Sequence, residues 1–309
     1  MKLLITGVHG FVGSNLVKAL SKEHTIYGLD IISPMKEGVR FTFGWDYLEK
    51  EDGIPEVDAI IHLAGKAHDT KNQTVSDVYF KVNTGLTQKI YDYFLTSKAK
   101  KFIFFSTAKA AADKVDGVLT EDVVPAPVGP YGESKIAAEK YIQEHLVDDK
   151  QVYILRPCMI HGPGNKGNLN LLYGVVKKGI PWPLGAFENR RTFTSIDNLC
   201  FVIDGLLTKD VPTGIYNMGD DEALSTNELI EEICKSLGKK AHIWKLSKGL
   251  MNGVAKIGGL LHFPLDPERL RKLTENYISS NAKIKKVLGV DKMPVDAREG
   301  LQKTLESFK

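Results

Sequence analysis

The residues with the clearest catalytic chemistry are a tyrosine and a lysine four positions apart, Tyr131 and Lys135. Side chains at this spacing lie on one face of a helix. There we expect the lysine ammonium to lower the pKa of the phenol from its ordinary value of about 10, so that the tyrosine can act as a general base near neutral pH. The same spacing recurs at Tyr173 and Lys177, so the spacing alone does not identify a catalytic pair.

The surroundings of the two pairs separate them. Tyr131 follows a proline-rich loop and opens a helix that leads into the expected strand 151–157. That helix lies next to the end of the strand before it, and ligands of open α/β sheets bind outside the carboxyl ends of the strands. We therefore predict a catalytic role for Tyr131 and Lys135. Tyr173 and Lys177 fall in the second half of the chain, where we predict an amphipathic helix face.

Two hydroxyls end the expected strand 101–107. Thr107 is predicted to hydrogen-bond the reacting oxygen of a substrate. Ser106 is the competing residue, but the alternation of side chains along a strand should point it the other way.

A glycine-rich turn follows the first expected strand and opens a helix, with the sequence Thr6-Gly7-Val8-His9-Gly10-Phe11-Val12-Gly13. Glycines at this spacing allow a tight turn, a close approach of backbone N–H groups to a pyrophosphate, and packing of helix against strand. The helix N-terminus adds partial positive charge. We predict that Gly7, Gly10, Phe11, Val12 and Gly13 bind a dinucleotide.

An acidic residue, Asp30, ends the second expected strand about 20 residues after this turn. A carboxylate there can accept hydrogen bonds from a ribose and repels a 2′-phosphate, which favours NAD over NADP. The alternative is an acid that merely ends a strand. Asp46 and Tyr47, after the third expected strand, are predicted to flank adenine, with ordinary loop residues as the alternative.

The order of elements predicts an α/β fold. Short β-rich runs alternate with helical patterns through the first half of the chain, which indicates βαβ crossovers and a parallel sheet. Several runs are almost continuously apolar, as strands covered on both faces are. The expected strands are 2–6, 25–30, 39–43, 59–64, 101–107 and 151–157.

After about residue 165 the sequence pattern changes to loops rich in Gly, Pro and Asn. We therefore expect a first domain over 1–165, to which 192–212 is added in space, and a second lobe over 166–309. Two helix starts are legible there, at Ser225 with Glu228 and at Asp296 with Glu299.

Composition excludes several classes of protein. The formal charge of +3 is too balanced for a nucleic-acid binder or a polybasic membrane binder to show itself through charge. Three cysteines without metal-type spacing favour a reducing compartment, the cytoplasm, and no metal site is legible. The longest apolar tract, 249–263, is too short to cross a membrane. No G-x-S-x-G elbow supports a serine hydrolase, so hydride chemistry is favoured.

With the glycine turn, Asp30, Thr107 and the Tyr131/Lys135 pair, the chain resembles the extended short-chain dehydrogenase/reductases, specifically the NAD-dependent sugar-nucleotide epimerase/dehydratase family. The resemblance spans nearly the whole chain. It is carried further by 62–65, Asn83, 130–135 and 155–164. The segment from Pro183 to Phe193 resembles bacterial polysaccharide-locus enzymes, UDP-sugar 4-epimerases or 4-ketoreductases.

The resemblance implies a Rossmann doubly wound parallel sheet that holds NAD and a smaller C-terminal α/β lobe that holds a nucleotide-diphosphate sugar. Catalysis would take place in the cleft between them. Tyr131 would be the acid/base, Lys135 would hold the nicotinamide ribose, and Thr107 would orient the substrate hydroxyl. The implied cofactor contacts further include Leu63, Ala64, Gly65, Lys66, Asn83 and Pro157, and the implied substrate contacts are Lys109, Asn168, Leu169 and Arg191. A homodimer is also implied.

The leading hypothesis is 4-epimerisation of a UDP-hexose or UDP-N-acetylhexosamine through a transient 4-keto sugar. The first alternative is an NAD(P)H-dependent 4-ketoreductase of a UDP-4-keto-6-deoxy sugar, which would use the same residues. Dehydration ranks third, because Ala108 and Lys109 stand where dehydratases of this family carry an Asp-Glu pair. A non-catalytic dinucleotide-binding module is the most remote alternative, since it would not need an intact Thr107/Tyr131/Lys135 set.

Overall fold

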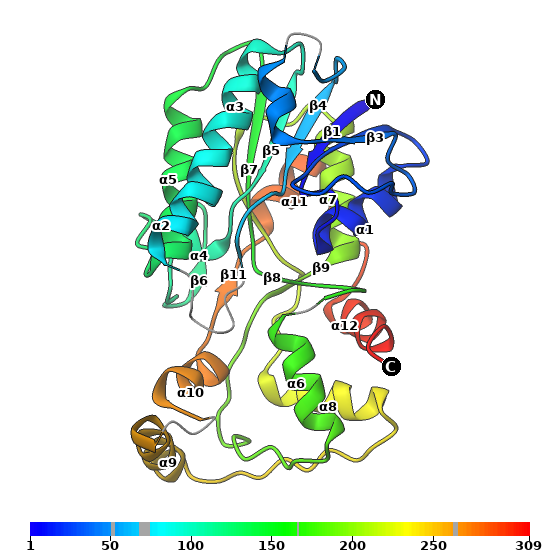
Figure 1. Cartoon of the computed structure of the whole chain (residues 1–309). Coiled ribbons are helices and arrows are strands. Elements are labelled where there is room, and N and C mark those ends of the chain that lie inside the picture. Colours follow the sequence, from blue (N-terminus) through cyan, green and yellow to red (C-terminus); the bar gives the residue numbers. More distant parts are fainter. Residues whose placement is uncertain (51–52, 68–74, 166, 262–264) are drawn as a thin grey trace.

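A seven-stranded parallel sheet forms the centre of the first lobe of the computed structural model (Figure 1). The structure describes residues 1–50, 53–67, 75–165, 167–261 and 265–309. The sheet order is β10-β7-β5-β4-β1-β2-β3, with every neighbouring pair parallel, which confirms the predicted doubly wound fold. Its strands are β1 Lys2–Thr6, β2 Thr25–Leu29, β3 Phe41–Phe43, β4 Ala59–His62, β5 Lys101–Phe105, β7 Gln151–Pro157 and β10 Gly214–Met218.

Helices cover both faces of this sheet, which explains why its central strands are apolar throughout. One face is packed by α1, α7 and α11, and the other by α3 and α5. The helices of this lobe are α1 Phe11–Leu20, α2 Ser76–Tyr79, α3 Leu86–Thr96, α4 Ala108–Ala111, α5 Pro130–Glu144, α7 Ile196–Thr208 and α11 Ala282–Leu288. A 3-10 helix spans Trp45–Glu49, and a π-helical turn spans Phe80–Gly85.

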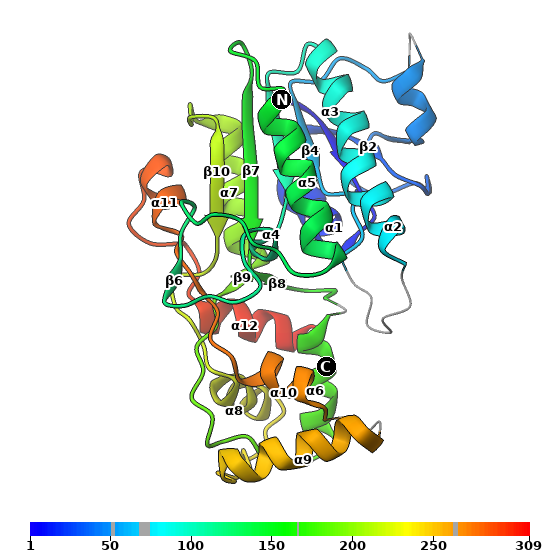
Figure 2. The same ribbon diagram turned by 90° about the vertical axis from the view of Figure 1, so that its left-hand side faces the viewer.

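The second lobe is mostly helical and lies at the carboxyl end of the sheet (Figure 2). Its helices are α6 Asn168–Lys177, α8 Thr226–Ser236, α9 Lys248–Leu261, α10 Pro267–Thr274 and α12 Ala297–Glu306. Two short parallel pairs join the lobes, β8 Met159–His161 with β9 Phe193–Ser195, and β6 Val118–Leu119 with β11 Ile278–Ser279. Tyr173 is buried in the core of this lobe, which confirms its predicted place on an amphipathic helix.

The predicted starts of α8 and α12 are confirmed. Ser225 and Glu228 form a reciprocal capping box. Asp296 accepts a hydrogen bond from the backbone of Glu299 at the start of the last helix.

The chain returns to the first lobe twice after residue 165. The sequence places 192–212 there, and the structure adds β10 and α11 to the same core. Each lobe is therefore built from segments that are distant in sequence.

The apolar tract at 249–263 forms most of α9, and residues 262 and 263 lie outside the described residues. None of the described helices is long and apolar enough to span a membrane.

The glycine turn between β1 and α1 needs its glycines for two different reasons. Gly7 has φ 69°, a backbone angle that residues other than glycine rarely adopt. Gly13 lies within α1, where a Cβ atom would stand 2.4 Å from the Gly7 carbonyl oxygen and 2.8 Å from Val8 Cα. The helix can therefore start this close to the turn only with glycine at 13.

We expect Gly13→Ala to lower the free energy of unfolding by about 1–3 kcal/mol, because the added methyl overlaps backbone atoms that cannot rotate away. The measurement is urea denaturation followed by circular dichroism. Gly174→Ala is the matched control: Gly174 is also helical, and a Cβ there meets no atom within 4 Å. That variant should be stabilised by about 0.5–1 kcal/mol. Equal effects of the two substitutions would contradict this account of the turn.

Candidate active site

Thr107 and Tyr131 meet at the carboxyl edge of the sheet. Thr107 follows β5 and caps α4, accepting a hydrogen bond from the backbone of Lys109 at 3.3 Å. Tyr131 stands in the first turn of α5, and its phenol is hydrogen-bonded to the Thr107 hydroxyl. Ser106 points away from them and donates to Glu139, as strand alternation predicts. A hydroxyl and a phenol thus face one point, where a substrate oxygen can accept or donate a proton.

Lys135 lies one helical turn after Tyr131 and is 5% exposed. Its Nζ donates to the Phe105 carbonyl oxygen at 2.7 Å and lies 4.9 Å from the centre of the Phe104 ring. Burial lowers the pKa of this ammonium to about 8, and the nearby Glu139 carboxylate acts in the opposite direction.

The prediction that Lys135 lowers the pKa of Tyr131 is wrong for this structure. Burial raises the pKa of the Tyr131 phenol above its ordinary value. The hydrogen bond from Thr107 lowers this pKa, but by less than burial raises it. The reason is geometric: the lysine ammonium reaches the end of β5 and bonds the Phe105 carbonyl rather than the phenol. The helical spacing places both residues on one face, but it does not fix where a long side chain ends.

A buried ion pair between Glu139 and Arg156 lies close to Lys135, and no role was predicted for it from the sequence. Glu139 is 0% exposed and Arg156, on β7, is 1% exposed. Their side chains form two well-placed bonds, from Arg156 Nη2 to Oε2 at 2.6 Å and from Nε to Oε1 at 3.0 Å. The available signals were a glutamate four residues after Lys135 and an arginine at the end of an apolar strand.

The Asn83 side chain forms hydrogen bonds with other residues of the protein. Its side chain is fully buried in the π-helical turn and binds the backbone N–H of Lys66 at 2.7 Å and its carbonyl at 3.1 Å. It also donates to Ser134 at 3.0 Å, and Ser134 donates to the Tyr131 carbonyl at 2.9 Å. Asn83 therefore ties the loop after β4 to the first turn of α5.

A second buried network fixes the start of the same loop. Thr6 Oγ1 accepts from the backbone N–H groups of Leu63 and Ala64, at 3.1 and 3.0 Å. The Thr6 hydroxyl also meets His62 Nδ1 at 2.7 Å. Burial and the charge of Lys135 hold the pKa of His62 well below its ordinary range, so this imidazole is neutral. The ends of β1 and β4 are thereby held together at the point where the sheet order reverses.

The residues of the glycine turn fit a dinucleotide. The Asp30 carboxylate lies beside the turn and accepts from the backbone N–H of His9 at 3.0 Å, which leaves it capacity for ribose hydroxyls. His9 Nε2 is buried and has no hydrogen-bond partner within the described ranges. Gly65 leaves open the space beside Lys135, because a Cβ there would stand 3.2 Å from Nζ. These residues are suited to hold the adenosine and nicotinamide ends of NAD.

The other residues expected near the cofactor lie around this edge. Phe11 and Val12 open α1, and Pro157 ends β7. Asp46 and Tyr47 lie in the 3-10 helix after β3 and make local contacts. Asp46 is paired with Lys50 at 2.6 Å, and the Lys50 ammonium lies 3.7 Å from the centre of the Tyr47 ring.

Two of the expected substrate residues, Lys109 and Arg191, are bonded to other residues of the protein. The Lys109 ammonium is paired with Asp113 at 3.1 Å. The Arg191 guanidinium donates to the Lys272 carbonyl, and its partly buried position lowers its pKa.

The remaining two expected substrate residues open α6. Asn168 is exposed, whereas the Leu169 side chain is buried in the core of the second lobe. Leu169 can therefore meet a ligand only through its backbone.

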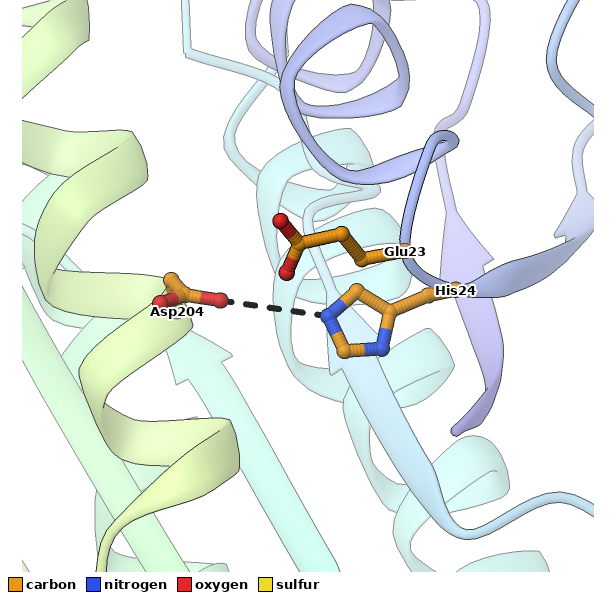
Figure 3. Close-up of side chains that lie close together, drawn as sticks. All are labelled: Glu23, His24 and Asp204. Carbon is orange, nitrogen blue, oxygen red and sulfur yellow. Dashed lines mark ion pairs between the residues drawn. The ribbon is translucent and has the colours of Figure 1, made fainter.

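A separate polar group lies on the first lobe, away from these residues. Glu23 and His24 in the turn before β2 face Asp204 of α7 (Figure 3), with His24 Nε2 3.8 Å from the Asp204 carboxylate. His24 Nδ1 lies 3.3 Å from the Met1 amine. Among the described residues these are the three ionisable groups closest to metal-ligand spacing. Their place at the amino end of the strands separates them from Tyr131, and both imidazole nitrogens already face charged groups.

Comparisons with known proteins show which family the chain is similar to. The model of the NAD dependent epimerase/dehydratase family matches residues 3–219. A UDP-glucose 4-epimerase of Vibrio cholerae is 31% identical over 99% of this chain and 95% of its own length. An N-acetyl-alpha-D-glucosaminyl-diphospho-ditrans,octacis-undecaprenol 4-epimerase of Escherichia coli O157:H7 is 25% identical over 98% of this chain and 94% of its own. The crystal structure of a UDP-glucuronic acid 4-epimerase from Bacillus cereus in complex with NAD superimposes with a TM-score of 0.77, at 23% identity, over 100% of this chain and 98% of the other.

We expect the Lys135 ammonium to lose its proton near pH 8, because burial disfavours its charge. The measurement is NMR of protein with ¹³C at lysine Cε, in which the signal lost in Lys135→Met identifies the residue. Glu139→Gln should move this titration to lower pH, since the Glu139 carboxylate raises the pKa. The exposed Lys50 is the internal control, because its ammonium is paired with Asp46 at 2.6 Å and this hydrogen bond raises its pKa above the ordinary value, so that it should titrate above Lys135. A Lys135 signal that titrates together with that of Lys50 would contradict the burial described here.

Proposed function

The chain belongs to the NAD dependent epimerase/dehydratase family, enzymes whose cofactor is NAD, and from that premise we propose that it is a 4-epimerase of a UDP-hexose or UDP-N-acetylhexosamine. The observation that carries the proposal is the Thr107–Tyr131 hydrogen bond at the carboxyl end of β5, beside a buried lysine. The 31% identity to a UDP-glucose 4-epimerase over nearly the whole chain supports the choice of substrate class.

The chain's own residues would move the proton. Tyr131 would exchange a proton with the sugar's 4-hydroxyl, and Thr107 would hold the same oxygen. NAD, held by the glycine turn and Lys135, would supply the acceptor and donor of the hydride at C4 of the sugar. Lys135 would hold the nicotinamide ribose from below, and Gly65 leaves the room for it.

The electrostatics of the site give Thr107 a second task. Since burial raises the pKa of Tyr131, the phenol is protonated at neutral pH in the structure described here. The Thr107 hydroxyl favours the ionised form by donating to it. Thr107 would therefore both orient the substrate and make the phenolate accessible.

The main alternative is a 4-ketoreductase of a UDP-4-keto-6-deoxy sugar, which would use the same residues. The two functions differ in how the cofactor is used. An epimerase returns the hydride to the same sugar and keeps its NAD, whereas a reductase consumes NADH with each turnover.

We expect Tyr131→Phe to lower turnover by about 10²- to 10⁴-fold, because the variant has no proton to exchange with the sugar. Cofactor retained through purification should be unchanged. The measurement is interconversion of UDP-glucose and UDP-galactose, and of their N-acetyl counterparts, by liquid chromatography. Tyr173→Phe is the matched control, since the Tyr173 hydroxyl is buried with no hydrogen-bond partner among the described residues. Its turnover should equal that of the unchanged protein, and a Tyr131→Phe enzyme of full activity would remove Tyr131 from the mechanism.

We further expect denatured enzyme to release nicotinamide cofactor, detected by mass spectrometry, and turnover to proceed without added NADH. Consumption of external NADH with a UDP-4-keto-6-deoxy sugar, together with no interconversion of any UDP-hexose pair, would replace the epimerase with the reductase.

A further inference from the structure

Helix α9 carries an apolar face that the described chain leaves uncovered. Leu250, Val254 and Ile257 are 55%, 44% and 58% exposed, and their spacing of four and three residues puts them on one side of the helix. The adjacent side packs into the core of the second lobe through Met251 and Ala255, which are 4% and 1% exposed. α9 is therefore apolar both toward the protein and on one flank toward solvent.

The position of α9 makes this face accessible. It lies along the end of the second lobe that is farthest from the sheet (Figure 2), with the preceding segment running along the same end (Figure 1). The catalytic residues lie at the opposite side of this lobe, at the edge of the sheet. Contacts made by α9 would leave this edge of the sheet open.

A tryptophan adjoins the exposed face. Trp244, four residues before α9, is 54% exposed. Its backbone is held by hydrogen bonds to Trp182 at 2.8 Å and from Gly185 at 3.0 Å. The indole thus projects from a fixed backbone, and indoles are enriched where an apolar phase meets water.

The charged side chains of Lys, Arg, Asp and Glu type in the segment 239–261 are all positive. From residue 239 to 261 the sequence has five lysines, at 239, 240, 245, 248 and 256, and no Asp or Glu. None of the five forms an ion pair with any residue that the structure describes, although Lys239 donates to the Lys177 carbonyl at 2.8 Å. The acids that follow in sequence, Asp266 and Glu268, already face Arg269 and Lys272. In a chain whose total charge is only +3, the segment 239–261 therefore carries a formal charge of +5.

We propose that this basic apolar surface, Trp244 and α9 with the five lysines, binds the surface of an anionic phospholipid bilayer. A helix with an exposed apolar face, with lysines in it and just before it and with a nearby tryptophan, has the properties of one that lies in the plane of a membrane interface. Its 14 residues are too few to span the bilayer. The sequence-based expectation of no membrane partner rested on total charge and on the length of apolar tracts, and neither detects an interfacial helix.

A second copy of this chain fits the same surface less well. Two such surfaces face to face would bring the lysines of both copies together without an acid between residues 239 and 261 to pair with them. Like charges opposed in this way disfavour association, whereas anionic headgroups neutralise them.

The test is sedimentation with vesicles of phosphatidylcholine alone or with about one-third phosphatidylglycerol. We expect binding to the anionic vesicles, weak binding to the neutral ones, and release as salt is raised, because the attraction is screened. Trp244 supplies a second readout: tryptophan fluorescence should shift to the blue with anionic vesicles, and Trp244→Phe should lose that shift. Equal binding to both vesicle types, or no binding to either, would overturn the proposal.

Variants separate the two parts of the surface. Lys245→Glu with Lys256→Glu should lower the partition coefficient on anionic vesicles by about tenfold or more. Leu250→Ser with Ile257→Ser should lower it as well, at unchanged charge. Leu146→Ser with Val147→Ser, which are 44% and 40% exposed at the far end of the first lobe, is the matched control and should bind like the unchanged protein.

All three double variants should keep the circular dichroism and the turnover of the unchanged protein. Sedimentation velocity tests whether a second copy of this chain binds the surface instead. A dimer that dissociates specifically in the α9 variants, with no vesicle binding by any form, would assign the surface to a second copy and overturn the membrane proposal.

Discussion

The buried ammonium of Lys135 is the constraint around which the first lobe is arranged. Its Nζ is held 2.7 Å from the last carbonyl of β5, in surroundings that lower its pKa to about 8. A charge in such a place needs compensation, which Glu139 supplies from one helical turn further along. Glu139 in turn is bonded to Arg156 and Ser106, so β5, α5 and β7 are joined by one polar network. The groups that position the candidate catalytic residues are the same groups that hold these three elements together.

Much of the first lobe could be predicted from the sequence, because its signals are local. Alternating apolar runs, a glycine turn after the first of them and a Tyr-x-x-x-Lys helix predict the doubly wound sheet and the edge at which the site forms. β10 was missed for the opposite reason. The strand β10 follows the first segment of the second lobe in the sequence, yet it pairs with β7 of the first lobe. Its residues, Gly214–Met218, contain no local pattern that predicts this pairing. Pairing across such a separation is decided by the assembled core.

The electrostatics of the site could not be predicted in the same way. Helical spacing places Tyr131 and Lys135 on one face, but the ammonium reaches a carbonyl of a strand that packs against the helix. Lys109 likewise bonds Asp113. A long flexible side chain can end several ångströms from its Cα, so its partner depends on tertiary neighbours. Short side chains were predicted better: Thr107 and Ser106 point as strand alternation requires, because their hydroxyls stay close to the backbone.

Contacts between the two lobes also link the second lobe to the Thr107 hydroxyl. The segment directly after Thr107 is held from the other lobe by Arg271, whose guanidinium lies 3.1 Å from the Asp113 carboxylate. The Tyr277 hydroxyl also donates to the Ala112 carbonyl at 2.9 Å. Because α4 is only four residues long, little separates these contacts from Thr107. A movement of the second lobe relative to the first would therefore act on the position of Thr107, and through its hydrogen bond on the protonation of Tyr131. Under the proposed function, substrate bound by the second lobe and proton transfer in the first would be coupled through this one short segment of the chain.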